Sequence, residues 1–333
     1  MLHDAGPALS RRISLETIRD AATHVYLAAV RTPLVRLELP SHAGTAEIFL
    51  KLETLQPIGS FKIRGAQNAI RRLARDELAE GVWTVSAGNA AQGVALAARL
   101  AGAPCSVMVM DTAPDTKLRS IERLGATIVK ASYDECWRTV EQHGSDRMRG
   151  RFVHPFDDDD FIAGNGTIGV EIVEDLPDVD AVIAPLGGGG LLAGIACALD
   201  ALRPEARVYA AEPETAAPLS VSFRNGAASR FEAWQPSFVD GAGGKSVLDT
   251  MWPLLRHWVD DSLVVSLDAA ARAMRVVADR VHVVSEGAAA CAVAAALSPR
   301  MTEAGHRKVV AVVSGGNIDL TRFAQLVGAC GQR

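Results

Sequence analysis

The chain has 333 residues, 49% of them hydrophobic and 22% charged, which is typical of a globular protein with a large core and about two domains. Its net charge of -5 excludes a general nucleic-acid binder, because such a protein needs a basic face. No apolar run reaches the length of a membrane span, and residues 1–7 lack the basic segment and apolar core of a signal peptide.

The cysteines are odd in number and widely spaced, and most of them lie in apolar segments: Cys105, Cys136, Cys197, Cys291 and Cys330. No Cys-x-x-Cys pair occurs, so the sequence indicates neither a disulfide framework nor a zinc site. We therefore expect a cytoplasmic protein.

The first predicted element is a helix that Ser14 can cap and that runs to about Ala29. Strands are predicted over residues 35–39 and 47–52, with a turn at 41–44, and a helix over residues 63–79. The arginine pairs at 11–12 and 71–72 are interpreted as solvated helix faces.

Strands and helices then alternate. The predicted strands cover residues 82–85, 105–110 and 127–130, and the predicted helices cover residues 90–101, 115–124 and 133–149. Such β-α-β units indicate a parallel sheet with right-handed crossovers.

A second series of elements is predicted to begin at residues 152–153. Its helices are expected within 166–175 and over 191–202, 268–280 and 286–297, and its strands over 181–185, 208–211, 263–266 and 309–313. The acidic run 157–160 is interpreted as a solvated loop that caps the next helix, because no His or Glu sits at metal-ligand spacing. Residues 222–244, rich in Gly, Ser and Ala, are interpreted as a long loop, a place where function often concentrates.

Lys62 lies between Phe61 and Ile63, shortly after an apolar strand. This setting could desolvate its amine, lower its pKa and make it a nucleophile towards an aldehyde. Taken alone, the stretch fits an ordinary lysine at a helix start, with its amine in water, at least as well.

Two loops between a predicted strand and a predicted helix carry small residues. The run Ser86-Ala87-Gly88-Asn89 can bring backbone N–H groups close to a carboxylate, although taken alone an ordinary helix cap by Ser86 or Asn89 explains it better. The run from Gly187 to Gly190, followed by Leu191, fits a phosphate at a helix N-terminus better than a merely flexible loop. It matches neither the Rossmann pattern nor the P-loop, so no nucleotide is expected.

A third loop, Ser314-Gly315-Gly316-Asn317, follows the last apolar strand. Ligands collect at the carboxyl ends of parallel strands, and Ser314 could form one hydrogen bond with a ligand atom there. An activated lysine, a phosphate loop and a carboxylate loop together indicate an aldehyde cofactor with a phosphate that acts on amino acids, which describes pyridoxal 5'-phosphate.

With these motifs the sequence resembles the serine/threonine dehydratase branch of the tryptophan-synthase-β-like pyridoxal-phosphate enzymes, a branch that also contains serine racemase. The resemblance runs from Thr32-Pro33-Leu34 to Asn317. It implies an α/β fold with two domains, each an open, mostly parallel sheet flanked by helices. Residues 1–80 and 157–333 would form the large domain that binds the cofactor, and residues 81–156 a small mobile domain.

The resemblance also implies roles for residues. The cofactor contacts would be Lys62, Phe61, Asn89, Gly187, Gly188, Gly189, Gly190, Leu191, Glu286 and Ser314. The substrate carboxylate would be held by Ser86, Ala87, Gly88, Asn89 and Ala90. Lys62 would bind the cofactor aldehyde and move the Cα proton, Phe61 would pack beside the ring, and Ser314 would meet the ring nitrogen.

The implied reaction is an α,β-elimination that turns a β-hydroxy amino acid, such as L-threonine or L-serine, into a 2-keto acid and ammonia. A neutral serine at the ring nitrogen would make the ring a weaker electron sink, which favours this elimination. The resemblance further implies a homodimer or homotetramer.

The chain departs from the family at three positions. Ala90 stands where the family has a histidine, so we expect a substrate with a larger or modified β-substituent. Ala87 stands where racemases have a second proton-carrying serine, so elimination is expected over racemisation. Glu212 matches the start of a cation site in some relatives, but Pro218 stands at the second ligand position, so no strong metal site is expected.

Two alternatives to the dehydratase stay open. One is another enzyme of this fold, either a racemase or a β-replacement enzyme of the cysteine-synthase type. The other is a non-catalytic protein that binds pyridoxal phosphate, against which the retention of Lys62, Asn89, the tetraglycine run and Ser314 argues.

Overall fold

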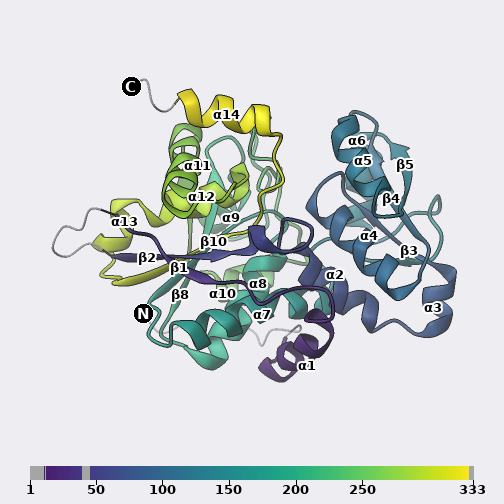
Figure 1. The fold of residues 1–333 in the computed structure, drawn as a ribbon, viewed down its shortest axis with the longest axis horizontal. Coiled ribbons are helices and arrows are strands. Elements are labelled where there is room, and N and C mark those ends of the chain that lie inside the picture. The colour runs from purple at the N-terminus through teal and green to yellow at the C-terminus, as the bar shows by residue number, and fades with distance from the viewer. Residues whose placement is uncertain (1–10, 12, 40–45, 330–333) are drawn as a thin grey trace.

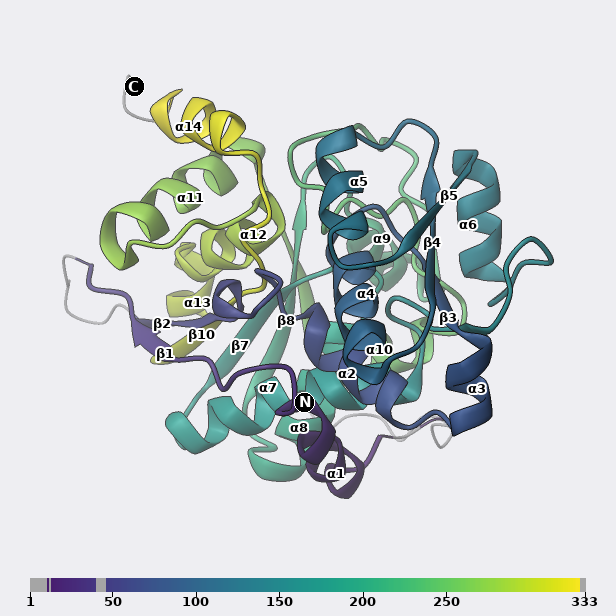
Figure 2. The same ribbon diagram turned by 45° about the vertical axis from the view of Figure 1, so that its right-hand side comes forward.

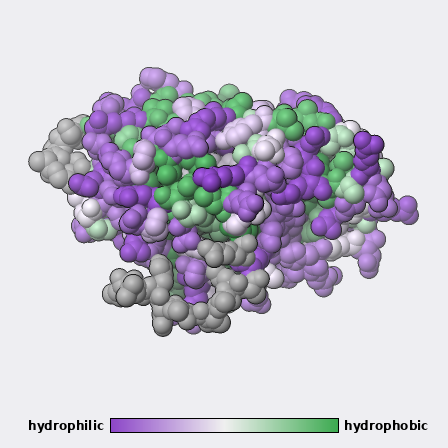
Figure 3. All heavy atoms as spheres, turned by 90° about the horizontal axis from the view of Figure 1, so that it is seen from below, coloured by the Kyte–Doolittle hydropathy of each residue, from purple (hydrophilic) through white to green (hydrophobic). Residues whose placement is uncertain are grey.

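The computed structural model describes residues 11, 13–39 and 46–329, whose elements form two groups around separate sheets (Figure 1). Within these ranges, no helix has the length and apolar composition that a membrane crossing requires. Seen from below, the surface carries mainly hydrophilic side chains, and hydrophobic atoms show over a limited part of that face (Figure 3). Most of the large apolar side chains of the described residues are buried.

The larger sheet has six strands in the order β1-β2-β10-β7-β8-β9. Its strands are β1 (Leu34–Arg36), β2 (Glu47–Leu52), β7 (Ala181–Pro185), β8 (Arg207–Pro213), β9 (Asp261–Val265) and β10 (Lys308–Val313). All neighbours pair in parallel except β1 with β2. Every residue of β7 is buried, as expected for a parallel strand covered on both faces.

Helices cover both faces of this sheet (Figure 1). One set is α1 (Leu15–Val25), α7 (Asp159–Asp175), α8 (Gly190–Leu202) and α10 (Trp252–Trp258), and the other includes α11 (Leu267–Val281), α12 (Gly287–Ala296), α13 (Pro299–Glu303) and α14 (Leu320–Ala329). Helix α9 (Pro218–Asn225) follows β8. The resulting layers place the carboxyl ends of β7 and β10 beside each other, because these strands are neighbours.

The smaller sheet has four parallel strands in the order β5-β4-β3-β6. They are β3 (Val82–Val85), β4 (Cys105–Met110), β5 (Thr127–Ala131) and β6 (Arg151–Phe152), accompanied by α3 (Arg75–Glu80), α4 (Asn89–Ala101), α5 (Asp115–Glu122) and α6 (Tyr133–Glu141). Helix α2 (Lys62–Arg71) packs on both α4 and α7, and so lies between the two groups (Figure 2). The division into residues 1–80 with 157–333 and residues 81–156 stays a prediction.

Most predicted elements are confirmed with small shifts at their ends, and Ser14 does cap α1 by accepting a hydrogen bond from Thr17 N. The predicted start of the second series at residues 152–153 is wrong, because β6 pairs with β3 in the smaller sheet. The helix predicted over 63–79 is divided into α2 and α3. The predicted turn at 41–44 and Cys330 lie outside the described residues.

Helix α6 ends at Glu141, well before the predicted residue 149. The chain turns there because His143 has a φ of 54° and Gly144 N donates back to Thr139 O. Helix α7 begins at Asp159, earlier than predicted, because Asp158 caps it by accepting from Phe161 N. Helix α9 occupies the start of the stretch predicted as a loop from residue 222.

The acidic run caps the next helix through Asp158, as predicted, but it is only partly solvated. Arg71 and Arg72 are exposed at the end of α2, as predicted, whereas Arg11 lies outside a helix and Arg12 outside the described residues. Asp157 is 4% exposed, so the acidic run is not simply a solvated loop, and Arg11 forms ion pairs with Asp157 and Asp159. Arg72 likewise pairs with Asp20 and Asp160. These contacts join segments far apart in the chain, which a reading of local patterns does not detect.

Candidate active site

Three loops that follow parallel strands meet at the start of α2. Residues 86–89 follow β3, the tetraglycine run 187–190 follows β7, and residues 314–317 follow β10. Ser60 forms a bridge with Gly315, and Phe61 N donates to Ser314 O at 3.0 Å, so the turn before Lys62 is joined to the end of β10. The candidate site therefore lies at the carboxyl ends of strands from both sheets.

Lys62 is the first residue of α2, and its side chain is half-buried. The amine donates to Pro155 O at 2.5 Å and lies 5.2 Å from the ring centroids of both Phe61 and Phe161. Burial lowers the pKa of the Lys62 amine to about 7, although the nearby Glu286 carboxylate opposes this. A large fraction of the amine is thus unprotonated at neutral pH, as a nucleophile or base requires.

A buried charge network holds α2 in place. Arg64, which is 0% exposed, donates to both carboxylate oxygens of Glu53 and of Glu171 at 2.6–3.0 Å. Lys51 also lies inside, with its amine 2.6 Å from Glu171 and 2.7 Å from Thr32 O. Two cations and two carboxylates balance, so the first turn of α2 is anchored to β2 and α7 without a net buried charge.

Asn89, Asn317 and Glu286 form a chain of hydrogen bonds. Asn317 Nδ2 donates to Asn89 Oδ1 and to Ile58 O, each at 2.7 Å, and Asn89 Nδ2 donates to Glu286 Oε1 at 2.8 Å. This chain joins α4 of the smaller sheet to the ends of β10 and α12. It fixes which way the Asn89 amide faces, because its oxygen accepts and its nitrogen donates.

Burial raises the pKa of the Glu286 carboxyl to about 7, while the hydrogen bond from Asn89 opposes the rise. The folded protein therefore binds a proton at Glu286 between its ordinary pKa of 4.5 and about 7, where an unfolded chain has released it. The contribution of this group to stability falls as pH rises through that window. Above about pH 7 a buried carboxylate remains beside the site.

Glu286→Gln is expected to raise the free energy of unfolding of the cofactor-free chain by about 1–3 kcal/mol at about pH 8 and to leave it unchanged at about pH 4.5. Glutamine keeps an oxygen that can accept from Asn89 but cannot ionise. Urea unfolding at the two pH values measures the difference. A stabilisation of equal size at both would contradict an ionisation of Glu286 in this window.

The loop before α4 closes on itself through Ser86, whose Oγ accepts from Gly88 N at 3.0 Å. Residues 86–89 are half-buried and Ala90 is buried. Asn89 and Ala90 are the first two residues of α4, and the N–H groups of a first helical turn have no partner within the helix. The loop can thus hold an anion, as the sequence predicted for a carboxylate.

The tetraglycine run has little room for side chains. Gly189 caps α8 with a φ of 95°, a Cβ on Gly187 would lie 2.7 Å from Gly241 O, and a Cβ on Gly188 would overlap the ring of Phe156. In the described part of the chain, no backbone carbonyl accepts from the N–H groups of residues 187–191. A helix N-terminus with free N–H groups fits a phosphate.

Buried polar atoms without a partner mark the same region. Ser60 Oγ and Ser285 Oγ are buried and have no hydrogen-bond partner among the described residues. Ser314 is 2% exposed. Such hydroxyls fit a polar ligand, since an unpaired buried hydroxyl is otherwise unfavourable.

The structure brings Lys62, residues 86–90, the tetraglycine run, Glu286 and Ser314 towards one place, and it adds groups that the sequence did not assign. Asn317 belongs to a predicted motif, but the sequence predicts no role for it. The Pro155 carbonyl and Gly241, which lies over Gly187, were not expected. A backbone carbonyl has no sequence signal, whereas Gly241 lies in the stretch 222–244, whose composition predicts a long loop where function concentrates.

Glu212, considered as the start of a cation site, has other partners here. Its carboxylate accepts from Leu219 N and Ser220 N at 2.9 Å, in the first turn of α9, and from Ser262 Oγ at 2.5 Å. Burial raises its pKa to about 7, and these hydrogen bonds oppose the rise. The N–H groups at the start of α9 thus interact with the Glu212 carboxylate, as a cation would in a metal site.

The chain is similar to known proteins over most of its length. A family model described as pyridoxal-phosphate dependent enzyme matches residues 25–315. The L-threonine ammonia-lyase of Thermotoga maritima is 39% identical over 321 residues, 95% of this chain and 78% of that protein.

Among solved structures, serine racemase from Dictyostelium discoideum superposes with a TM-score of 0.82 and 32% identity, covering 92% of this chain and 99% of that one. The processed form of threonine deaminase isoform 2 from Solanum lycopersicum has a TM-score of 0.82 and 29% identity, with 96% of each chain covered.

Proposed function

The chain belongs to the family of pyridoxal-phosphate-dependent enzymes, and we propose that within it the protein is an ammonia-lyase of the threonine/serine dehydratase type. It converts a β-hydroxy amino acid to a 2-keto acid and ammonia. The fold is the α/β arrangement of two mostly parallel sheets that its structural relatives share.

The observation that carries the proposal is the state of Lys62. An amine with a pKa of about 7 lies 5.2 Å from the centroids of two aromatic rings at the start of α2. The unpaired buried Ser60 hydroxyl lies on the turn before Lys62. The start of α8, whose N–H groups have no backbone acceptor among the described residues, packs through Gly188 on Phe156, next to the Pro155 carbonyl that binds the amine. These groups fit pyridoxal phosphate, which needs an amine for its aldehyde and a cradle for its phosphate.

When bound, the cofactor supplies an aldehyde that takes up an amino group and a ring that withdraws electrons from the substrate Cα. We assign the phosphate to the N–H groups from Gly187 to Leu191, the ring nitrogen to Ser314 and the ring face to Phe61. Lys62 supplies the amine that binds the aldehyde and, once free, the base that accepts the Cα proton. A base with a pKa near the working pH does this best.

The loop from Ser86 through Ala90 would hold the substrate carboxylate, and this assignment is supported by its half-buried helix N-terminus. Asn89 would orient ligands next to it, because Asn317 and Glu286 fix its amide. Ala87 cannot carry a proton, which supports elimination over racemisation. The serine racemase relatives favour the opposite outcome and make racemase activity the second candidate.

The substrate is tested by measuring 2-keto acid release from threonine, serine, β-phenylserine and 3-hydroxyaspartate. Because the small Ala90 is buried where the family has a histidine, we expect kcat/KM to favour a larger β-substituent over threonine. A clear preference for threonine would reject that substrate preference, and no release from any of them would reject the ammonia-lyase. Accumulation of a D-amino acid would identify a racemase, and product formation only with O-acetylserine and sulfide a β-replacement enzyme.

Gly188→Ala is expected to raise the Kd for pyridoxal phosphate at least ~10-fold, because the added methyl group would push the tetraglycine run away from the Phe156 ring. Gly328→Ala, which has open space around it, is the matched control and should leave the Kd unchanged. Absorbance titration of the cofactor-free chain measures both. An unchanged Kd in Gly188→Ala would show that the tetraglycine run does not bind the cofactor.

We further propose a cytoplasmic homodimer or homotetramer. Leu55 and Val30 are 49% and 46% exposed, and the Gln56 side chain next to Leu55 bonds both the N–H and the carbonyl of Val30, which brings the two segments together. Leu27 is 60% exposed, and exposed apolar side chains of this kind are available to contact a partner subunit. A mass of one chain by light scattering would contradict the oligomer.

A further inference from the structure

The turn from His154 to Asp157, between β6 and α7, touches the candidate site through two consecutive residues. The Lys62 amine donates to Pro155 O at 2.5 Å, and the ring of Phe156 packs against Gly188. The same turn therefore meets both the amine and the tetraglycine run.

His154 holds this turn through its imidazole. Its Nδ1 accepts from Asp157 N at 2.8 Å and more weakly from Phe156 N at 3.4 Å, and its Nε2 lies 3.1 Å from Val140 O in α6. Since Nδ1 must accept, the proton lies on Nε2, which donates to Val140. One side chain thus closes the turn and joins it to the smaller sheet.

His154 stays neutral in this role. It is 2% exposed, and burial lowers its pKa to about 4, helped by the charges of His143 and Lys62 and opposed by Asp157. A protonated ring would have no lone pair for the N–H of Asp157. The turn is therefore held throughout the neutral range.

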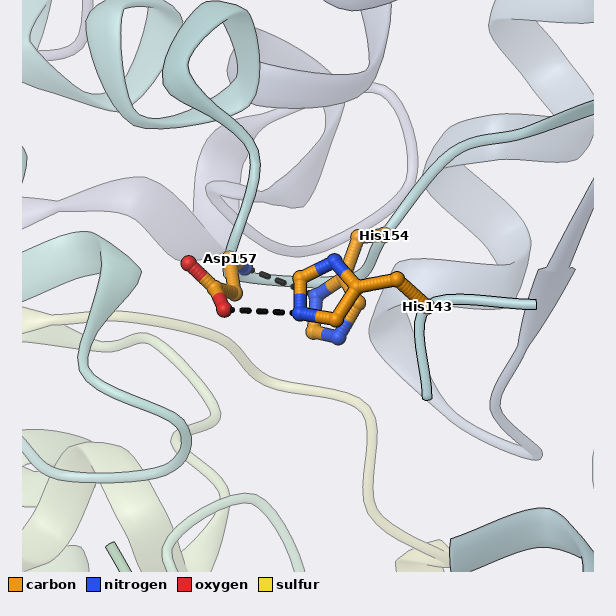
Figure 4. Close-up of side chains that lie close together, drawn as sticks. All are labelled: His143, His154 and Asp157. Carbon is orange, nitrogen blue, oxygen red and sulfur yellow. Dashed lines mark hydrogen bonds and ion pairs between the residues drawn. The ribbon is translucent and has the colours of Figure 1, made fainter. Parts of the chain in front are cut away.

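The carboxylate of Asp157 fixes the other end of the turn (Figure 4). It pairs with Arg11, accepts from Thr250 Oγ1 at 2.5 Å, and lies 3.0 Å from His143 Nε2. His143 also stacks on His154, with ring centroids 4.4 Å apart. His143, His154 and Asp157 have the residue types and spacing of a metal site, but both ring nitrogens of His154 are already used in hydrogen bonds.

We propose that His154 is a positioning residue for Lys62: its Nδ1 shapes the turn so that the Pro155 carbonyl receives the free Lys62 amine. In the reaction, the proton leaves the substrate Cα and binds Lys62 Nζ, where the carbonyl then accepts a hydrogen bond from the ammonium group. A hydrogen bond to a charged group favours that charged form. The carbonyl thus directs the amine and makes it a stronger proton acceptor.

Two variants separate this role from a general effect on folding. In His154→Asn, the side-chain oxygen can replace Nδ1 as acceptor for Asp157 N, as in an Asx-turn, but the reach to Val140 is lost. In His154→Gln, the longer amide can still donate to Val140 O, but no acceptor remains close to Asp157 N. His143→Asn is the control, because it removes the stacked ring and the Asp157 contact and tolerates the φ of 54°.

The first readout is the pKa of Lys62 in the full-length chain freed of cofactor, from the pH dependence of its modification by an amine reagent, followed by peptide mass analysis. We expect a fall of about one unit in His154→Gln, and wild-type values in His154→Asn and His143→Asn. This measurement does not depend on which reaction the enzyme performs. Thermal unfolding shows whether each variant is folded.

The second readout, which rests on the proposed function, is turnover of a hydroxyamino acid by the holoenzyme. We expect kcat to fall about 10-fold in His154→Gln with KM little changed, and to stay within about 3-fold of wild type in His154→Asn. Equal Lys62 pKa values in the two His154 variants would overturn the proposal, whether or not turnover is seen. Absence of turnover in wild type with the pKa difference present would reject the proposed function alone.

Discussion

Lys62→Ala is expected to lower kcat at least ~1,000-fold, because one amine supplies both the covalent link to the cofactor aldehyde and the base for the Cα proton. The amine is suited to both tasks because burial lowers its pKa to about 7. The variant should still bind pyridoxal phosphate non-covalently through the tetraglycine run. Borohydride should then fix the cofactor to wild type and not to the variant.

The matched control is Lys130→Ala, which removes an exposed lysine from β5. It should retain wild-type turnover and be fixed by borohydride as wild type is. Mass analysis of the reduced wild-type protein should find the cofactor on the peptide that contains Lys62. Attachment at another lysine, or turnover by Lys62→Ala within about 10-fold of wild type, would disprove the assignment.

Glu171→Gln is expected to lower the free energy of unfolding by about 3–5 kcal/mol, because it leaves the two buried cations with one fully buried carboxylate, Glu53. The exposed Asp175 lies 3.8 Å from Lys51 and compensates only in part. Lys51→Met should be destabilising for the opposite reason, since it leaves two carboxylates facing Arg64 alone. The double variant restores a neutral network. It should therefore be more stable than the sum of the two single changes predicts, by about 1–3 kcal/mol.

Urea unfolding of the wild type, the two single variants and the double variant measures the coupling between Glu171 and Lys51. Arg300→Ala, which breaks the exposed pair with Asp261, is the control and should change stability by less than about 1 kcal/mol. Although burial opposes it, the charges of Arg64 and Lys51 hold the pKa of Glu171 below its usual range. The stabilisation by Glu171 is therefore present at neutral pH and lost on acidification. The free energy of unfolding of Glu171→Gln should then fall less on acidification than that of wild type. Strict additivity of the two changes would contradict a shared network.

The sequence alone determined the features that depend on neighbours in the chain. Alternating apolar runs and helix formers predicted the order of strands and helices, and runs of small residues at strand ends predicted the loops at Ser86, Gly187 and Ser314. These signals are local because hydrophobic periodicity, helix caps and glycine conformations act over a few residues. Lys62 was identified because all of these loops pointed to one ligand.

Only the tertiary structure decided how distant residues meet. The chain places Asp157 beside Arg11, His143 and Thr250, so a carboxylate that the local pattern assigned to solvent is buried. The tertiary structure also pairs β6 with β3. Residues 151–152 therefore belong to the smaller sheet and not to the second series of elements that the sequence predicts. Local periodicity describes one element at a time, whereas pairing and burial depend on which elements pack together.

The same limit applies to the chemistry of the site. Sequence predicted a lysine whose amine could be desolvated, but its pKa of about 7 depends on burial by Phe61, Phe161 and the Pro155 turn, together with the distance to Glu286. A pKa is set by desolvation and by nearby charges in space, and neither follows from order along the chain. Residue type and motif thus determined what Lys62 can do, and packing decided that its amine is poised to do it.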